Sequence, residues 1–330
     1  MRAVVLRSHN GPESLVIEEV DDPVPGPDEV LVDIRAAALN RADMLQTMGF
    51  YPDPRGVQPE IPGMEFAGTV SAVGARVRSW QSGDTVMAIE AGGAYADRIA
   101  VHERQLMRVP DTIALADAAA IPEVYLTAWD ALVVQGGLTS GRWALVHAGG
   151  SGVGTASILI AKAIGARIAV TCSAGKVEAC RALGADIVVD YGSQDFVAEM
   201  RDATSGVGPD VILDVIGGDY VGRNIAAIAT QGRIIQVGLM GGGVTEVNVG
   251  MLLTKRASII GTTLRGRPLE QKAALTQRFI REVLPLFERG ALRPIIDSRY
   301  PFVDIADAHR YMATNANIGK ILIDIADGRR

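Results

Sequence analysis

The chain has 330 residues and a formal net charge of −6, and 48% of its residues are hydrophobic, which is typical of a globular protein with about two domains. No basic run exceeds a few residues, so we do not expect nucleic acid as a partner. Two cysteines imply no disulfide framework, and no stretch offers the ~18 uninterrupted apolar residues of a membrane span. These features predict a soluble cytoplasmic protein that does not associate with membranes.

Residues 1–120 contain short apolar runs separated by glycine and proline, a pattern that indicates strands joined by tight turns. Strands are expected at residues 1–6, 15–20, 30–34, 65–73, 85–89 and 96–101. One short helix is expected at Arg41–Met48, with Asn40 as its N-cap and Gly49 as its stop. Many short strands with this punctuation favour a compact, β-barrel-like domain.

From about residue 122, continuous apolar runs alternate with stretches that can form helices, such as residues 153–164, 177–183 and 194–203. The apolar runs cover residues 143–148, 167–172, 187–190, 211–216, 234–238 and 258–264. Apolar strands that alternate with helices predict parallel βαβ units, and six of them match a doubly wound α/β sheet. We assign residues 122–266 to this second domain.

The last segment changes pattern again. It begins with a long amphipathic stretch, Leu269–Glu288, which is followed by an expected helix at Phe302–Met312 and a final strand at Lys320–Ile325. We interpret this segment as the chain returning to the first domain, which then comprises residues 1–121 and 267–330.

A glycine-rich turn lies between the first apolar strand and the first helix of the second domain. Gly149, Gly152 and Gly154 allow a sharp turn and a close backbone approach to a pyrophosphate, and the following helix N-terminus offers free N–H groups. A glycine triplet alone could be an ordinary turn between a strand and a helix. Five further strands of the parallel type follow it, which favours a Rossmann dinucleotide site.

The end of the second strand predicts which dinucleotide binds. NAD sites place an acid about 20 residues after the glycines, and that count reaches Cys172 here, with no acid in the run that follows. Ser173 can donate to a 2′-phosphate, and Lys176 can pair with it. We therefore expect NADPH rather than NADH, although Lys176 could also be a solvated lysine in the first turn of a helix.

Several segments resemble the zinc-free quinone oxidoreductase branch of the medium-chain dehydrogenase/reductase superfamily, over essentially the whole chain. They are Leu39–Asp43, Gly49–Pro52, Ile61–Glu65, Ala120–Glu123, His147–Gly154, Asp214–Gly217, Gly238–Gly243 and Asn317–Lys320. Within that branch, the chain is most similar to the tumour-suppressor-inducible, zeta-crystallin-like quinone oxidoreductases. The resemblance implies a GroES-like catalytic domain, a Rossmann domain, a cofactor in the cleft between them, and a homodimer often joined through the Rossmann sheets.

The same resemblance predicts that no zinc is bound. Zinc-bearing relatives have a cysteine at the position of Asn40 and a histidine at the position of Met64, and this sequence has neither. A catalytic zinc needs three protein ligands, and the four histidines show no ligand spacing. Two cysteines are too few for a four-cysteine structural site.

The resemblance also implies which residues contact the cofactor. Asn40 and Tyr51 would lie near the nicotinamide, where Tyr51 could donate a proton to an oxygen that gains charge. The remaining expected contacts are Thr127, Gly149, Ser151, Gly152, Val153, Ser173, Lys176, Tyr191, Ile216, Gly217, Gly238, Met240, Leu264 and Asn317. The alternatives are a simple N-cap for Asn40, a packed loop tyrosine for Tyr51, and core packing for the apolar residues.

Other polar residues have simpler explanations. His147 lies inside an apolar strand and is expected to be a buried histidine with satisfied hydrogen bonds. Arg265 and Arg267 are expected to be solvated, although Arg265 could still approach the mouth of the active site. The leading functional hypothesis is an NADPH-dependent quinone reductase. One alternative is a reductase of enones or enoyl thioesters, for which we see no clear basic patch that would hold a coenzyme A phosphate. The other is a non-catalytic, crystallin-like NADPH-binding protein.

Overall fold

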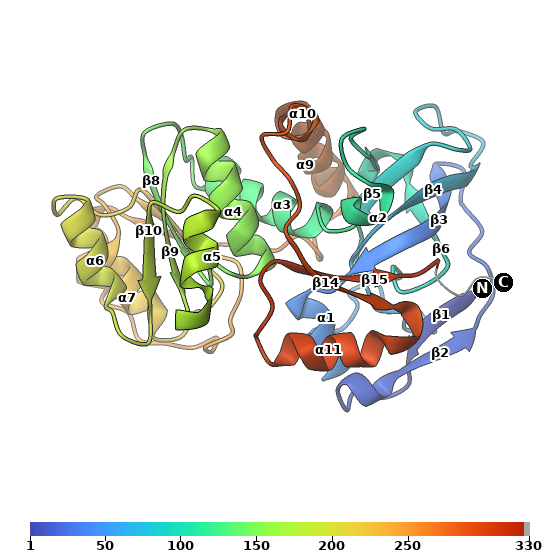
Figure 1. Ribbon diagram of the computed structural model, residues 1–330, viewed down its shortest axis with the longest axis horizontal. Helices are drawn as coiled ribbons and strands as arrows, with labels where there is room; N and C mark the ends of the chain where they lie inside the picture. The colour runs from blue at the N-terminus through green and yellow to red at the C-terminus, as the bar shows by residue number, and fades with distance from the viewer. Residues whose placement is uncertain (327–330) are drawn as a thin grey trace. The chain divides into compact units, whose positions relative to one another are not determined.

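The chain forms two compact units in the computed structural model, which describes residues 1–326 (Figure 1). The first unit comprises Met1–Leu126 together with the segment that begins at Leu264, and the second comprises Thr127–Thr263. The boundaries expected from sequence lie at residues 121 and 266. No helix among the described residues is long and apolar enough to cross a membrane.

The first unit is built on a seven-stranded sheet and a separate hairpin, β1 with β2. Its strands are β1 (Arg2–Leu6), β2 (Leu15–Glu19), β3 (Glu29–Ala38), β4 (Glu65–Val73), β5 (Thr85–Ile89), β6 (Arg98–His102), β7 (Met107–Arg108), β14 (Ile296–Pro301) and β15 (Lys320–Asp324). The large sheet has the order β14-β15-β3-β4-β5-β7, with β6 also paired to β3. Because β15 pairs antiparallel with β3, the last strand of the chain completes the sheet formed by the first hundred residues.

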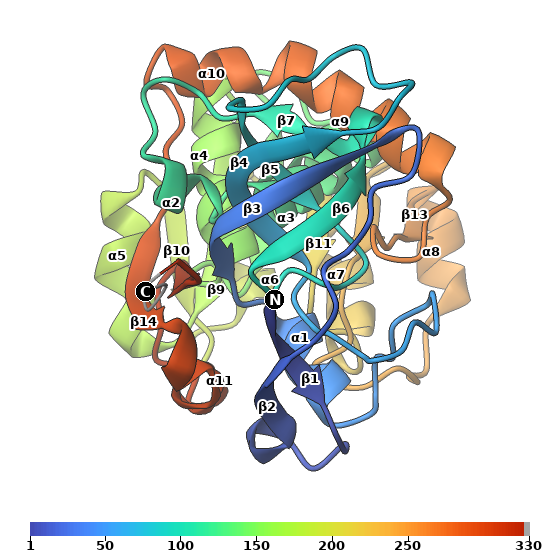
Figure 2. The same cartoon turned by 90° about the vertical axis from the view of Figure 1, so that its right-hand side faces the viewer.

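Helices flank this sheet at its ends and faces. They are α1 (Arg41–Thr47), α2 (Leu115–Ala118), α9 (Leu269–Glu282), α10 (Leu284–Glu288) and α11 (Ile305–Ala313), and α3 (Pro122–Trp129) runs across the boundary into the second unit. Figure 2 shows α11 beside β14. The sheet's core follows the expected period of two: Val30, Val32 and Ile34 have no exposed surface, whereas Asp33 between them is partly exposed.

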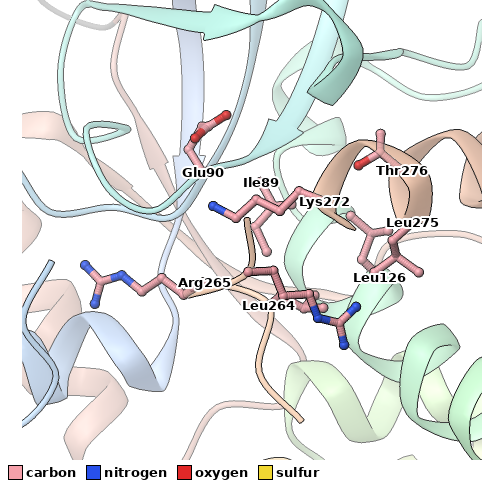
Figure 3. A pocket seen from close by; sticks show the side chains of 9 residues that line it. Ile89, Glu90, Leu126, Leu264, Arg265, Lys272, Leu275 and Thr276 are labelled. Carbon is pink, nitrogen blue, oxygen red and sulfur yellow. The ribbon is translucent and has the colours of Figure 1, made fainter. Parts of the chain in front are cut away.

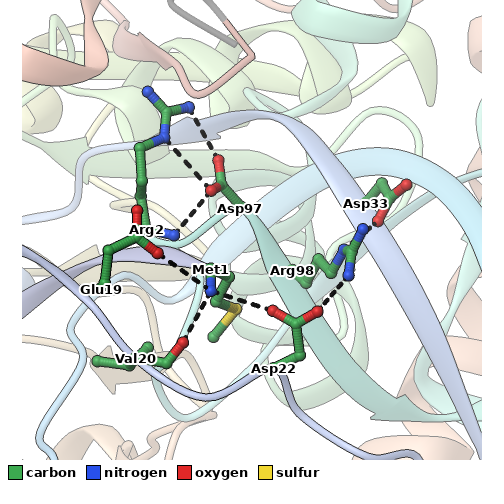
Figure 4. A network of polar contacts seen from close by, with 8 residues as sticks. All are labelled: Met1, Arg2, Glu19, Val20, Asp22, Asp33, Asp97 and Arg98. Atoms are coloured by element: carbon green, nitrogen blue, oxygen red, sulfur yellow. Dashed lines mark hydrogen bonds and ion pairs between the residues drawn. The ribbon is translucent and has the colours of Figure 1, made fainter. Parts of the chain in front are cut away.

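A partly buried ion pair fixes the N-terminal hairpin to the rest of this unit (Figure 4). The Arg2 guanidinium donates to both carboxylate oxygens of Asp97, and its Nη2 also donates to the carbonyl oxygen of Ile325 at 3.0 Å. The Asp97 carboxylate holds the pKa of Arg2 above its usual value. The neighbouring Arg98 bridges Asp22 and Asp33 in the same network.

The second unit is the expected doubly wound α/β domain. Its six parallel strands are β8 (Trp143–His147), β9 (Arg167–Cys172), β10 (Ile187–Asp190), β11 (Val211–Asp214), β12 (Arg233–Gln236) and β13 (Ser258–Gly261), in the order β10-β9-β8-β11-β12-β13. The helices are α4 (Gly152–Ala163), α5 (Val177–Ala182), α6 (Phe196–Ala203), α7 (Tyr220–Ala227) and α8 (Val249–Lys255). Alternate strand residues enter two separate cores, one that includes residues of α4 and α5 and one that includes residues of α6 and α7.

The structure resolves the last segment in more detail than the sequence did. The amphipathic stretch Leu269–Glu288 forms two helices, because Pro285 has no N–H to continue the hydrogen-bond ladder and instead lies in the first turn of α10. Strand β14 was not expected, since its sequence Ile-Asp-Ser-Arg-Tyr-Pro is mostly polar; it forms by parallel pairing with β15.

Candidate cofactor and substrate site

The glycine-rich turn between β8 and α4 is packed too tightly for side chains at two of its glycines. A Cβ atom at Gly154 would lie 2.3 Å from the carbonyl oxygen of Ala148, and one at Gly149 would lie 2.6 Å from the Cβ of Val170. Both positions therefore exclude side chains. Ser151 is the N-cap of α4, and its hydroxyl accepts from the Gly154 amide at 3.0 Å. Gly152 and Val153 form the first turn of α4, whose N-terminus attracts anions.

The structure places Lys176 beside this turn. A Cβ atom at Gly150 would lie 2.5 Å from Cδ of Lys176, so the lysine side chain passes directly over the glycine. Ser173 follows the end of β9, and its carbonyl oxygen accepts from the Lys176 amide at 2.9 Å. Tyr191 follows β10, is 55% exposed, and donates its amide to the carbonyl oxygen of Cys172. Ser173, Lys176 and Tyr191 thus lie beyond the carboxyl ends of neighbouring strands.

Two further turns at the same edge of the sheet are hydrogen-bonded to each other. The Gly241 amide donates to the carbonyl oxygen of Ile216 at 2.6 Å, and the Met240 amide donates to that of Val215 at 3.3 Å. Gly217 has a φ of 69°, a backbone conformation that favours glycine. The structure therefore brings Ile216 and Gly217 together with Gly238 and Met240, where ligands bind in open α/β sheets.

His147 has the buried, hydrogen-bonded environment expected from sequence. Its Nδ1 lies 3.1 Å from the Thr171 hydroxyl, and its Nε2 lies 2.8 Å from Oδ1 of Asn224. Asn224 then donates to Asp214, whose other carboxylate oxygen accepts from the amides of the Ile216–Gly217 turn. Burial lowers the pKa of His147. The histidine therefore supports the turn after β11 from inside the sheet.

In the first unit, Asn40 belongs to a buried polar cluster that sequence reasoning missed. Its Nδ2 donates to Glu65 at 3.0 Å, and its Oδ1 accepts from the Lys320 ammonium at 2.6 Å. The Lys320 ammonium lies 2.7 Å from Glu65, and both side chains are at most 4% exposed. Asn40 is also the expected N-cap of α1, where its amide donates to Asp43. Its side chain therefore has protein partners at both ends.

Tyr51 is held by an arginine that was expected to be solvated. Arg265 is only 5% exposed, which corrects that expectation. Its guanidinium donates to the carbonyl oxygens of Tyr51 at 2.8 Å and Ala91 at 2.6 Å, and to the side-chain oxygen of Gln46 at 2.6 Å. The guanidinium carbon also lies 4.9 Å from the centre of the Tyr51 ring. Three neutral acceptors compensate this buried cation, which no single-residue pattern in the sequence reveals.

The remaining expected contacts are divided between the two units. Thr127, 6% exposed, lies in α3 on the side assigned to the second unit. Leu264 and Asn317 belong to the first unit, where the Asn317 side chain donates to the carbonyl oxygen of Gly319 at 2.9 Å. Within residues 1–326, no three His, Cys, Asp or Glu side chains are grouped so that they could hold a metal ion.

Known proteins match both units. Residues 26–111 match the alcohol dehydrogenase GroES-like domain, and residues 183–323 match the zinc-binding dehydrogenase family. The synaptic vesicle membrane protein VAT-1 homolog of Rattus norvegicus is 30% identical over 98% of this chain and 84% of its own length.

Solved structures of several oxidoreductases are also similar. An NAD-dependent alcohol dehydrogenase has a TM-score of 0.87 at 31% identity, covering 99% of this chain and 100% of its own. The quinone oxidoreductase of Escherichia coli, complexed with NADPH, has a TM-score of 0.88 at 27% identity, covering 98% and 100%. The JamJ enoyl reductase has a TM-score of 0.88 at 26% identity, covering 98% of each chain. The chain therefore belongs to the medium-chain dehydrogenase/reductase superfamily and is an oxidoreductase with a GroES-like domain and a nicotinamide-cofactor-binding Rossmann domain.

Proposed function

We propose that this oxidoreductase is a cytoplasmic, NADPH-dependent quinone reductase that works without a metal ion. The observation that carries the proposal is Lys176, whose side chain lies over the glycine turn at a strand end that has no acid. NADPH, when bound, supplies the hydride, and the protein supplies orientation and electrostatics. The likeness to the NADPH complex of a quinone oxidoreductase supports the same assignment.

The residues around the turn fit the cofactor's phosphates. Gly149 and Gly154 keep the turn tight, because a Cβ atom at either position would collide with Val170 or with the Ala148 carbonyl, and the α4 N-terminus favours an anion. Lys176 would pair with the 2′-phosphate and Ser173 would donate to it. The neighbouring strand does end in an acid, Asp190, the last residue of β10, and its carboxylate accepts from the Gly192 amide and the Ser193 hydroxyl. The Asp190 carboxylate therefore bonds within its own turn rather than to a ribose hydroxyl, which favours NADPH over NADH.

At the acceptor end, the proposal assigns proton donation to Tyr51. The Arg265 guanidinium fixes the backbone of this loop and stacks on its ring, so the phenol would be held in one position. Asn40 would support the site indirectly, since its amide is bonded to Glu65 and Lys320. Reduction of an electron-poor quinone needs no Lewis acid to stabilise an alkoxide.

Cofactor preference is tested with Lys176→Ala. Loss of one charge-assisted contact should raise KM for NADPH by about 10- to 100-fold and leave KM for NADH nearly unchanged. Lys162→Ala is the matched control, because Lys162 forms a surface ion pair with Asp186. Equal effects of Lys176→Ala on both cofactors would refute the NADPH assignment.

The acceptor is tested by NADPH consumption with 9,10-phenanthrenequinone, 1,4-benzoquinone and crotonyl-coenzyme A side by side. We expect turnover with the quinones, and its absence with both would overturn the proposal.

A double-bond reductase is the second candidate, and one observation favours it. The structure gathers the basic residues Arg265, Arg267 and Lys272 around one pocket, although the sequence showed no clear basic patch. Turnover of none of the three would instead favour a non-catalytic NADPH-binding protein.

We also propose a homodimer formed through the second unit. Strand β13 is at the edge of its sheet, and exposed edge strands readily pair with another chain. Apolar side chains are exposed beside it: Val249 is 62%, Leu253 75% and Ile259 38% exposed. Leu253→Lys should shift the mass measured by light scattering from dimer to monomer. A dimer that persists unchanged would refute this interface.

A further inference from the structure

Gln46, in α1, is a buried glutamine that holds both halves of the loop carrying Tyr51. The loop comprises residues 48–64 and joins α1 to β4. The Gln46 side chain is fully buried, and its Nε2 donates to Oε1 of Glu60 at 2.7 Å. Its Oε1 accepts from Nη2 of Arg265 at 2.6 Å, and Nη1 of Arg265 donates to the carbonyl oxygen of Tyr51 at 2.8 Å. One amide group is therefore connected to the first half of the loop through Arg265 and to the second half through Glu60.

The position of the Arg265 guanidinium depends on this glutamine. Burial lowers the pKa of Arg265, and a buried cation is stable only where its N–H groups find acceptors. Backbone carbonyl oxygens, those of Ala91 and Tyr51, provide two of the acceptors, and Gln46 supplies a third. Figure 3 shows the Arg265 side chain extending away from Leu275. Removal of the Gln46 amide would take this acceptor from Nη2, and the guanidinium would then shift from the Tyr51 carbonyl toward water.

Glu60 determines which way the Gln46 amide faces. A carboxylate only accepts hydrogen bonds, so it selects the Nε2 end of Gln46 and turns Oε1 toward Arg265. An amide facing the other way would direct its own N–H groups at those of the guanidinium. The Glu60 side chain is 13% exposed, and its Oε2 lies 3.7 Å from Nε2 of His9. The negative charge of Glu60 therefore acts on Arg265 through an oriented amide.

We propose that Gln46, oriented by Glu60, is a positioning residue that holds Tyr51 in place to donate a proton to the reduced quinone. This inference rests on the proposed function. The quinone accepts a hydride from NADPH and becomes a hydroquinone anion, the Tyr51 hydroxyl gives its proton to the oxygen of that anion, and water returns a proton to the Tyr51 phenolate. A displacement of about 1 Å can cost about 100-fold in such a step, so a residue that fixes the loop affects the rate without touching the quinone.

The first test exchanges the amide and the carboxylate. Gln46→Glu alone brings two carboxyl groups into contact and should lower kcat with 9,10-phenanthrenequinone by about tenfold, with KM for NADPH nearly unchanged. In the double variant with Glu60→Gln, the carboxylate at position 46 accepts both from Arg265 and from the amide at position 60. We expect kcat to return to within about threefold of that of the parent protein. A double variant no faster than Gln46→Glu would refute the proposal.

Tyr51→Phe separates this inference from the proposed function. We expect Tyr51→Phe to lower kcat by about 100-fold, because water is then the only proton donor. Gln46→Leu should lower kcat by about tenfold in the parent protein and have no further effect when combined with Tyr51→Phe. Losses that multiply would show that Gln46 acts independently of Tyr51, which refutes the positioning role and leaves the proposed function standing. An unchanged kcat in Tyr51→Phe would instead overturn the proton donation that the proposed function assigns to Tyr51.

Trypsin cleavage at Arg55 tests the hold on the loop without any turnover. Arg55 lies in this loop, and its side chain is 40% exposed. Gln46→Leu should raise the rate of cleavage at Arg55 by about tenfold or more, and the double variant Gln46→Glu with Glu60→Gln should restore slow cleavage. The matched control is Gln277→Leu, since that glutamine donates to the carbonyl oxygen of Arg104 in the same unit. Unchanged cleavage in Gln46→Leu would refute the proposal even if quinones are reduced.

Discussion

Asp43 is a completely buried carboxyl group whose ionisation should make the stability of this protein depend on pH. Its Oδ2 accepts from the Asn40 amide at 2.8 Å and from the Tyr95 hydroxyl at 2.9 Å. Its Oδ1 has no partner among the described residues. Burial is the largest cause that raises the pKa of Asp43, to about 6, and the nearby cations Lys320 and Arg265 only partly oppose it.

The size of the effect on stability follows from the shift in the pKa of Asp43. A change from 3.8 to about 6 is about two pKa units, or about 3 kcal/mol of preference for the neutral carboxyl in the folded state. The contribution of Asp43 to stability is therefore fully present below about pH 4. It is lost as pH rises through about 6, because the folded protein must then accommodate a buried negative charge.

Asp43→Asn isolates this contribution. The asparagine oxygen can accept from both Asn40 and Tyr95, while its amide replaces the oxygen that lacks a partner. Urea unfolding of both proteins should show the stability of the variant relative to the parent rising by about 3 kcal/mol between pH 4 and pH 8.

A second aspartate provides the control of opposite sign. The pKa of Asp84 is lowered by its hydrogen bond from the Gln81 amide and by Arg108, so Asp84 stabilises the protein above about pH 4 and loses that effect on acidification. Asp84→Asn should therefore become less stable than the parent as pH rises. A difference between Asp43→Asn and the parent that stays constant with pH would refute the reasoning about Asp43.

Two further predictions concern the cofactor turn and the buried cluster. Gly154→Ala should weaken NADPH binding in a fluorescence titration by about tenfold or more, because its Cβ would overlap the Ala148 carbonyl, whereas Gly175→Ala should have little effect since no atom lies within 4 Å of its Cβ. Equal affinities for the two variants would contradict this. Lys320→Met should cost about 3–5 kcal/mol in urea unfolding by leaving Glu65 buried without a counter-charge, and adding Glu65→Gln should recover part of that loss. A double variant no more stable than the single one would argue against the buried charge as the cause.

Local patterns in the sequence predicted most of the second unit. The strands Arg167–Cys172 and Ile187–Asp190 have the bounds expected from their apolar runs, because strands buried on both faces are nearly continuous in Val, Ile and Ala. The glycine turn and its helix were equally visible, since their chemistry is carried by adjacent residues. His147 was correctly interpreted as buried because it interrupts such a run.

Features that depend on distant residues were not predictable. Lys320 donates a hydrogen bond to Asn40, which is 280 residues away in the sequence, and Arg265 donates to Gln46, which is 219 residues away. Neither pair produces a periodic pattern in the sequence. The sequence also does not distinguish a buried arginine that donates to neutral acceptors from a solvated arginine. Strand β14 was missed for a related reason, since its pairing partner β15 rather than its own composition determines it.

The cluster around Asn40 bears on how the acceptor site is organised. The resemblance to the superfamily implies a cysteine, a zinc ligand, at the position of Asn40 in zinc-bearing relatives. Here the Lys320 ammonium contacts both Asn40 and Glu65, so a protein cation balances the buried Glu65 carboxylate. The charge requirement of Glu65 is thus met within the chain. The Asn40 side chain donates to Glu65 and accepts from Lys320, so both ends of its amide are used. We infer that Asn40 positions the junction between β3 and α1 rather than offering a hydrogen bond to the substrate.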